Sequence, residues 1–349
     1  MTRYVVIGAG AVGGTIAGRL AHRGHQVVLV ARGEHLSALR RDGLHLRTPD
    51  LDTRLPVTAI GGPEEIELRP DDVLVLSTKT HQAVAALSQW ADAPVRDGGH
   101  TAPAGARLPI LTALNGVSSE QMALRYFDRV FGVCVWLPAV HLHPGEVIAR
   151  GTPQSGILHI ARYPAIRTEP ADRDLLEQVS AHWSESGLGV ELPADVMPWK
   201  YHKLLSNIGN AFQAVLGPAA DSGDLTDAAR AEARAVLAGA GIEVTSDDEA
   251  AVRQVSFGVG EVPGTDPDRM GGSSWQSLAR GTGSIETDYL NGQIALIARE
   301  HGLAAPLNTT IAALARQAAR TGARPGAISA ADLAAELGLD PLASRAPRS

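Results

Sequence analysis

Several features are rare or absent in this 349-residue sequence, and each absence excludes a class of protein. The single cysteine, Cys134, excludes a disulfide within the chain and fits a reducing compartment. No apolar segment is long enough to span a membrane, and the first residues favour a strand over a signal peptide, so we expect a cytoplasmic protein without a membrane partner. Acidic residues outnumber basic ones, and the net charge of −7 argues against nucleic-acid binding, because phosphate contacts need a basic surface.

The stretch from residue 4 to residue 32 combines a buried strand, a glycine turn, a helix and a second buried strand. Its GAGAVGG segment matches the G-x-G-x-x-G motif: Gly8 permits a tight turn, Gly10 lets the backbone approach a pyrophosphate, and Gly13 allows the helix to pack closely on the strand. The N-terminus of the helix offers unpaired N–H groups to the phosphates. We therefore expect dinucleotide contacts from Gly8, Ala9, Gly10, Ala11, Val12 and Gly13.

The residue at the tip of the second strand distinguishes between the two nicotinamide dinucleotides. An acidic residue there would hold the ribose 2′-hydroxyl of NADH, whereas a 2′-phosphate needs a cation. The chain has Arg32, whose guanidinium can bind a phosphate through two parallel hydrogen bonds. This favours NADP (NADPH) as the cofactor, although Glu34 nearby could still serve a ribose.

The length and composition fit a soluble protein of two domains, with 44% hydrophobic and 20% charged residues. Strand and helix patterns alternate before Pro193, and long helical patterns follow it. The expected elements are strands at 4–7, 26–30, 44–47, 72–78 and 109–114, antiparallel strands within 131–160, a helix at 34–41, a surface loop at 102–107, and helices at 199–216, 227–240, 285–301 and 309–319. We expect an α/β fold class, with an N-terminal Rossmann-type dinucleotide-binding domain (1–193), an all-α C-terminal domain (194–340) and a disordered tail (341–349).

Polar residues follow two further strands of the expected parallel sheet. Thr78 and Lys79 come after one of them, and Asn115 comes after the next. Ligands bind beyond the carboxyl ends of the strands in such sheets, so these residues are expected on the cofactor side. Each could also be an ordinary loop residue, since Asn-Gly is a common turn pair.

The expected helix at 199–216 carries three polar side chains at helical spacing. Lys203, Asn207 and Asn210 stand at i, i+4 and i+7, which places them on one face among apolar neighbours. They indicate either the polar wall of a cleft or an exposed polar stripe. Ser274 in a glycine-rich loop and Glu286 in the first turn of a later helix are further candidates, although caps and first-turn acids have structural roles too.

With these residues identified, the sequence resembles the ketopantoate reductase (2-dehydropantoate 2-reductase) family over nearly its whole length. The resemblance is carried by the GAGAVGG turn, Arg32, Thr78-Lys79, Asn115-Gly116, Lys203-Leu204-x-x-Asn207, Ser273-Ser274, Glu286-x-Asp288-Tyr289-Leu290-Asn291-Gly292, Gly302, Pro306 and Asn308. It implies that Lys203 is the general acid and that Glu286 binds the substrate hydroxyl and helps to position the lysine. It also implies substrate contacts from Ser274, from Asn207 or Asn210, and from Lys79 and Asn115 beside the nicotinamide.

The resemblance implies NADPH-dependent reduction of 2-dehydropantoate to pantoate, in pantothenate biosynthesis. Three departures bear on the substrate: Asn207 and Asn210 are three residues apart instead of four, Trp275 stands where Met is common, and Ile285 stands where Thr is common. A reductase of another 2-oxo acid, whether merely different or bulkier, is therefore an alternative. A non-catalytic NADPH sensor is a third hypothesis, opposed by the presence of a proton donor. The sequence leaves the oligomeric state open, a homodimer included.

Overall fold

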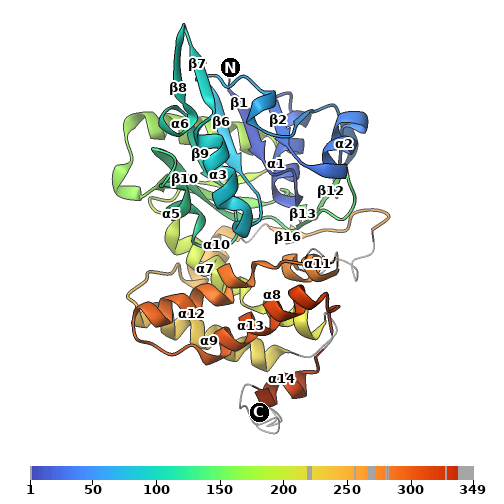
Figure 1. Cartoon of the computed structure of the whole chain (residues 1–349), viewed down its shortest axis with the longest axis vertical. Coiled ribbons are helices and arrows are strands. Elements are labelled where there is room, and N and C mark those ends of the chain that lie inside the picture. Colours follow the sequence, from blue (N-terminus) through green and yellow to red (C-terminus); the bar gives the residue numbers. More distant parts are fainter. Residues whose placement is uncertain are drawn as a thin grey trace. The chain divides into compact units, whose positions relative to one another are not determined.

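The computed structural model describes residues 2–217, 222–254, 257–265, 272–279, 281, 283–326 and 328–336, and the tail expected at 341–349 lies outside them. The chain forms two compact units (Figure 1). The first comprises Met1–Lys200 and Thr245–Thr265, and the second comprises Tyr201–Val244 and Asp266–Ser349.

The first unit is built on an eight-stranded sheet with the order β15-β14-β10-β9-β6-β1-β2-β5. Neighbouring strands are parallel, except that β14 runs antiparallel to β10. Strands β1, β6 and β9 are buried along their whole length, as expected for parallel strands covered on both faces. The strands are β1 (Arg3–Ile7), β2 (Gln26–Val30), β5 (Thr58–Ile60), β6 (Asp72–Leu76), β9 (Pro109–Thr112), β10 (Arg129–Trp136), β14 (Ile157–Tyr163) and β15 (Gly189–Glu191).

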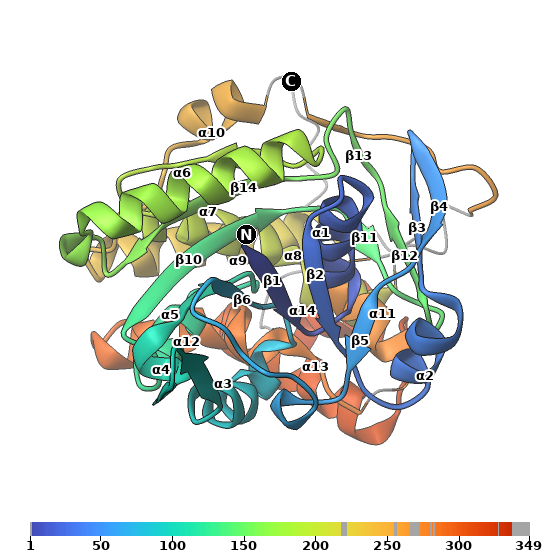
Figure 2. The same ribbon diagram turned by 90° about the horizontal axis from the view of Figure 1, so that it is seen from above.

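Helices cover both faces of this sheet, so the first unit has three layers (Figure 2). Ile16 of α1 (Ala11–His22) and Trp183 of α6 (Pro170–Glu185) share a core with one face of the strands. Trp90 of α3 (Ala83–Ala91) shares a core with the other face. The remaining helices of this unit are α2 (Gly33–Asp42), α4 (Ala104–Arg107), α5 (Ser119–Ala123), α10 (Asp247–Gln254) and the short 3₁₀ turns η1 (Pro63–Glu65), η2 (Thr80–Gln82) and η3 (Ala165–Arg167).

Smaller sheets flank the central one. A four-stranded sheet has the order β11-β12-β3-β4, and two pairs join β13 to β16 and β7 to β8. The expected surface loop at 102–107 is wrong, because the chain there ends a hairpin strand and forms α4, in which Ala104 and Gly105 are buried. The strands are β3 (Leu44–Thr48), β4 (Leu51–Leu55), β7 (Pro94–Asp97), β8 (His100–Pro103), β11 (Ala139–Val140), β12 (Glu146–Ala149), β13 (Gly151–Thr152) and β16 (Gly258–Val259).

The division between the units differs from the boundary expected near residue 193. Helix α7 (Met197–Asn207) begins in the first unit, where Trp199 stacks on the His159 ring at 4.0 Å and its carbonyl oxygen accepts a hydrogen bond from the Cys134 thiol. The 245–265 segment also belongs there, because β16 pairs with β13. Cys134 is buried.

The second unit is helical throughout its described residues, so an α/β unit with a parallel sheet is joined to an all-α unit, as the fold-class prediction states. None of the helices described in either unit is both long and apolar enough to span a lipid bilayer. The elements of the second unit, besides the end of α7, are α8 (Gly209–Leu216), α9 (Gly223–Gly239), α11 (Ser273–Ala279), the 3₁₀ turn η5 (Glu286–Tyr289), α12 (Asn291–Glu300), α13 (Pro306–Thr321) and α14 (Ala330–Glu336).

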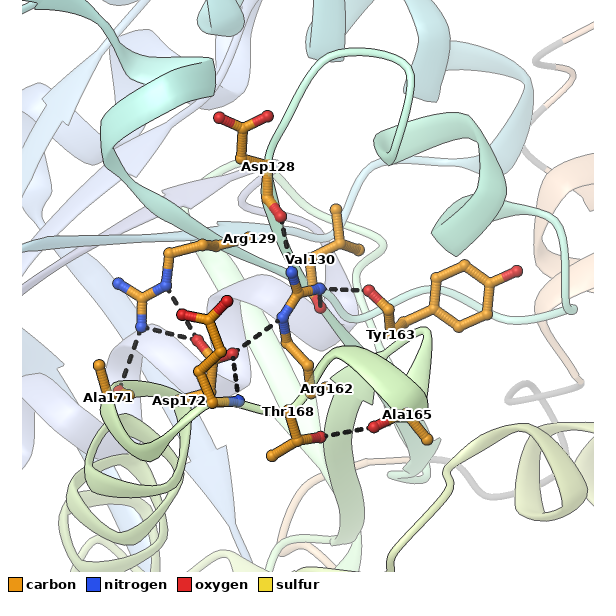
Figure 3. Close-up of polar contacts among 10 residues, drawn as sticks. Asp128, Arg129, Val130, Arg162, Tyr163, Ala165, Thr168, Ala171 and Asp172 are labelled. Carbon is orange, nitrogen blue, oxygen red and sulfur yellow. Dashed lines mark hydrogen bonds and ion pairs between the residues drawn. The ribbon is translucent and has the colours of Figure 1, made fainter.

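A cluster of charged side chains, of which Arg162 and Asp172 are buried, links the amino end of β10 to its neighbours (Figure 3). The Asp172 carboxylate accepts hydrogen bonds from Arg129 at 3.0 Å and from Arg162 at 3.1 Å. Arg162 also donates to the carbonyl oxygens of Val130 and Asp128. Because β10 runs parallel to β9, this cluster lies at the amino ends of the parallel strands and is a structural feature of the edge opposite the expected cofactor contacts.

Candidate cofactor and substrate site

The turn between β1 and α1 has the packing that a phosphate-binding loop requires. Gly8 has a φ of 111°, and a Cβ on it would lie 2.9 Å from the backbone of Ser77. A Cβ on Gly13 would overlap the Gly8 carbonyl oxygen, whereas one on Gly10 would meet nothing within 4 Å. Packing therefore requires the outer two glycines, and the open space at Gly10 leaves the backbone accessible to a ligand.

The first turn of α1 follows this glycine turn directly and contains no acidic residue. None of the side chains that the structure describes caps the helix. The backbone N–H groups of Ala11 and Val12, both half-buried, thus retain the capacity to donate to an anion.

Arg32 lies two residues beyond the end of β2 and is the N-cap residue of α2. Its side chain is exposed, and no hydrogen bond or ion pair holds it among the described residues. Glu34, in the first turn of the same helix, is exposed as well. The guanidinium is therefore available to an anionic group of a ligand, at no cost to contacts within the protein.

The loops after β6 and β9 are joined by a hydrogen bond. Thr78 and Lys79 follow β6, and the Thr78 hydroxyl is buried without a hydrogen-bond partner among the described residues. The Thr80 hydroxyl donates to the Asn115 carbonyl oxygen at 3.4 Å, across the gap between the two loops. Strands β9, β6, β1 and β2 are adjacent and parallel. All the cofactor residues expected from the sequence therefore follow the carboxyl ends of neighbouring strands.

A buried ion pair, which the sequence analysis missed, supports the turn that carries Asn115. Lys200 forms this pair with Glu120, and the two side chains are 1% and 0% exposed. The Lys200 ammonium also donates to the Leu114 carbonyl oxygen at 3.3 Å, and the Thr112 hydroxyl donates to the Glu120 carboxylate at 2.7 Å. A charged residue at the start of an apolar helix was the only sequence signal, and its partner lies 80 residues earlier.

In the second unit, the expected single helix at 199–216 is broken, and this changes the predicted polar stripe. Helix α7 ends at Asn207 and α8 begins at Gly209, a residue type that weakens helices. Lys203 and Asn207 therefore share a face of α7, whereas Asn210 lies on α8. Asn207 is 6% exposed, and its amide nitrogen has no hydrogen-bond partner among the described residues.

The start of α11 packs against α8 and brings Ser274 into the same unit. The Gly272 amide donates to the Gln213 side-chain oxygen at 2.9 Å, and a Cβ on Gly272 would lie 3.3 Å from the Asn210 side-chain oxygen. Ser274 is 2% exposed, and its buried hydroxyl lacks a partner among the described residues. The contacts thus bring Asn210 and the α11 segment together.

Glu286 begins η5 and is buried, with 5% of its surface exposed. Two motif residues beyond it have structural roles that the sequence analysis did not assign. The Asn291 side chain donates to the Ile208 carbonyl oxygen, at the break between α7 and α8, and to the Asn308 side chain at 3.0 Å. Asn308 in turn donates to Glu232 at 2.9 Å. This buried network fixes the helix break that follows Asn207.

Each unit, taken by itself, contains groups suited to a different ligand. The first presents backbone N–H groups and a cation suited to dinucleotide phosphates. The second contains an ammonium, a buried carboxylate and buried polar atoms that have no partner among the residues described, the groups from which a site for a small polar substrate is built.

Two family models match the chain. The one described as "Ketopantoate reductase PanE/ApbA" matches residues 4–164, and the one described as "Ketopantoate reductase PanE/ApbA C terminal" matches residues 195–319.

Curated relatives match the chain over most of its length. The chain is 27% identical to the 2-dehydropantoate 2-reductase of Pyrococcus horikoshii, over 90% of this chain and 96% of the relative. It is 28% identical to the 2-dehydropantoate 2-reductase of Halobacterium salinarum, over 92% of this chain and 100% of the relative.

Two solved structures are similar in fold. A PanE/ApbA family ketopantoate reductase from Ralstonia eutropha JMP134 has a TM-score of 0.71 at 24% identity, and the match covers 92% of this chain and 99% of that one. A ternary structure of D-mandelate dehydrogenase with NADH and anilino(oxo)acetate has a TM-score of 0.72 at 18% identity, with the same coverage. At these identities the likeness establishes the fold.

Proposed function

The chain belongs to the ketopantoate reductase family, and from this membership we propose that it reduces 2-dehydropantoate (ketopantoate) to pantoate, with NADPH as the hydride donor. The matching relatives are reductases, so the chain is an oxidoreductase. This argues against the hypothesis of a non-catalytic NADPH sensor. The proposed reaction supplies pantoate for pantothenate synthesis.

The choice of NADPH rests on Arg32. The site would bind a dinucleotide through the glycine turn and the first N–H groups of α1, and the exposed guanidinium after β2 would pair with the 2′-phosphate. When bound, NADPH supplies the hydride that is added to the ketone carbon. Lys79 and Asn115, at the ends of adjacent strands, are proposed to flank the nicotinamide.

Lys203 is proposed as the general acid. Hydride addition to a ketone builds negative charge on the carbonyl oxygen, and an ammonium directed at that oxygen both stabilises the charge and donates the proton that completes the alcohol. Glu286 is proposed to accept a hydrogen bond from the substrate hydroxyl and to orient the lysine. Its burial strengthens both interactions because water competes less.

The observation that carries the substrate assignment is a pair of buried polar atoms that have no hydrogen-bond partner among the described residues. Burying a polar atom without a hydrogen bond costs about 1–3 kcal/mol, so each such atom calls for a ligand. The Asn207 amide nitrogen and the Ser274 hydroxyl are two of these atoms in the second unit, and both can donate to the carboxylate or ketone of a 2-oxo acid. Asn210, beside the α11 segment, is the alternative amide donor.

Steady-state assays with ketopantoate and NADPH test the proposal directly. We expect NADPH oxidation that depends on ketopantoate and yields pantoate, with NADH a much poorer donor. Absence of turnover with ketopantoate under either dinucleotide would refute the substrate, and preference for NADH would refute the cofactor.

A second substrate class is favoured by Trp275. This half-buried indole follows Ser274 directly, and its size would reshape a pocket built around that serine. The fold likeness to a D-mandelate dehydrogenase makes an aromatic 2-oxo acid the natural comparison. Assays of phenylglyoxylate beside ketopantoate separate the two substrate classes. A larger kcat/KM for phenylglyoxylate would show that an aromatic 2-oxo acid, and not ketopantoate, is the substrate.

A further inference from the structure

His35 lies in the first turn of α2 and is hydrogen-bonded through both ring nitrogens. Its Nε2 lies 2.7 Å from the carbonyl oxygen of Ala9, in the glycine turn. Its Nδ1 lies 2.9 Å from the backbone nitrogen of Gly145, in the turn before β12. The imidazole ring thus bridges the dinucleotide-binding turn to a turn 110 residues away from His35 in sequence.

These contacts permit a single neutral tautomer. A backbone N–H can only donate, so the Nδ1 of His35 must be the acceptor for Gly145. The proton of the neutral ring then resides on Nε2, where it donates to the Ala9 carbonyl oxygen. Protonating Nδ1 would set two N–H groups against each other and break the bond to Gly145.

Gly145, the residue at the far end of this bridge, is held in place by contacts of its own. It has a φ of 78°, and a Cβ on it would lie 3.1 Å from the Cβ of Ala38. Its carbonyl oxygen accepts a hydrogen bond from the His45 amide at 2.8 Å. Through its two hydrogen bonds, the His35 ring therefore couples the position of the Ala9 carbonyl to that of the turn at Gly145.

Burial, more than any neighbouring charge, disfavours the protonated form of His35. The His141 ring packs on it, with centroids 4.3 Å apart, and a second protonated imidazole there would add repulsion. Glu146 follows Gly145, but its carboxylate is paired with His45 and Arg47. Arg32 and Glu34 precede it on α2 and are exposed, and the glycine turn contributes no titratable side chain. Burial lowers the pKa of His35, partly opposed by its hydrogen bond to Ala9.

We propose that neutral His35 is a positioning residue for the dinucleotide: by holding the Ala9 carbonyl, it keeps the glycine turn in the shape that receives the pyrophosphate. Protonation of His35 at acid pH disrupts the bridge and weakens cofactor binding. Both ring nitrogens are already engaged, so the imidazole does not itself bind the 2′-phosphate, and that contact is left to Arg32. This inference rests on the dinucleotide site of the proposed function.

The test compares the NADP⁺ affinity of His35→Phe with that of the wild type. Phenylalanine keeps a ring beside His141 but cannot form either hydrogen bond. We expect the Kd for NADP⁺ to rise about tenfold near neutral pH, equivalent to about 1.4 kcal/mol. His35→Gln, whose amide can still donate to Ala9, should fall between the two. His100→Phe, at an exposed histidine of β8, is the matched control and should bind as the wild type does.

The pH dependence distinguishes positioning from a general loss of stability. The ratio of the two Kd values, His35→Phe over wild type, should shrink toward one as the pH falls through the lowered pKa of His35, because the protonated wild type has lost its bridge as well. Titration of the 2′-phosphate occurs with both proteins and cancels in this ratio. A ratio that stays near one at neutral pH, or that exceeds one without changing with pH, would overturn the inference.

A measurement of the wild-type His35 ring tests the tautomer without comparing affinities. The ring nitrogen shifts of His35 in an NMR spectrum, assigned by their absence in His35→Gln, should report the Nε2–H tautomer. The Nδ1–H tautomer would overturn the inference. If the wild type binds neither NADP⁺ nor NAD⁺, the proposed function fails as well. Binding by the wild type with unchanged affinity in His35→Phe defeats only the role of His35.

Discussion

Replacing Arg32 by alanine should separate the two nicotinamide dinucleotides. The Arg32 side chain is exposed and has no partner among the described residues, so its removal costs the folded protein little. A charge-assisted hydrogen bond is worth about 1.5–3 kcal/mol, and an exposed one lies toward the low end. We therefore expect the Kd for NADPH to rise by a factor on the order of 10 to 100, while the Kd for NADH changes by less than about twofold.

Fluorescence titration of each dinucleotide measures this difference. Arg69→Ala is the matched control, because Arg69 is also exposed but lies before β6, at the opposite ends of the parallel strands. The NADPH effect should diminish as salt is added, since an exposed phosphate–guanidinium pair is screened. Equal losses for NADPH and NADH, or an equal loss with Arg69→Ala, would refute the assignment of Arg32 to the 2′-phosphate.

Three further variants test other parts of the structure. Ser274→Ala should raise the KM for the 2-oxo acid about tenfold and leave the KM for NADPH unchanged in steady-state assays, and an unchanged KM for the acid would remove this hydroxyl from the substrate site. Lys200→Met leaves a buried carboxylate uncompensated and should lower the free energy of unfolding by about 3–5 kcal/mol in urea titrations, with most of the loss recovered when Glu120→Gln is added; no recovery would show that the pair is not the cause. The Arg19 guanidinium lowers the pKa of Asp50 to about 2. The stabilisation from this ion pair is therefore present above the ordinary carboxyl pKa and is lost as the pH falls through about 2. The difference in melting temperature between wild type and Asp50→Asn should vanish over this range, and a constant difference would contradict the linkage.

The sequence predicted those features that depend on neighbouring residues. The strand, glycine turn and helix around Gly8 form a local unit, and the parallel sheet brings the ends of its strands to one edge. The break at Ile208 was not predicted, because the Asn291 side chain that binds its carbonyl lies 83 residues later. The same holds for His35 and for Lys200, whose partners are distant in sequence and leave no periodic pattern.

The domain boundary expected near residue 193 differs from the division into units because that division also depends on contacts between residues distant in sequence. Composition changes near residue 193, but compactness depends on contacts. The 245–265 segment returns to the first unit through the pairing of β16 with β13. A strand of two residues gives almost no signal in a sequence, since strand patterns need several alternating positions.

The central claim is that Lys203 donates the proton as a hydride from NADPH reduces ketopantoate. Single-turnover oxidation of NADPH, with saturating ketopantoate, tests it most directly in the wild type and in Lys203→Ala. We expect one pantoate formed per NADPH oxidised by the wild type, and a rate slower by on the order of a hundredfold or more in the variant, with NADPH affinity preserved. An equal rate in the variant would contradict the claim.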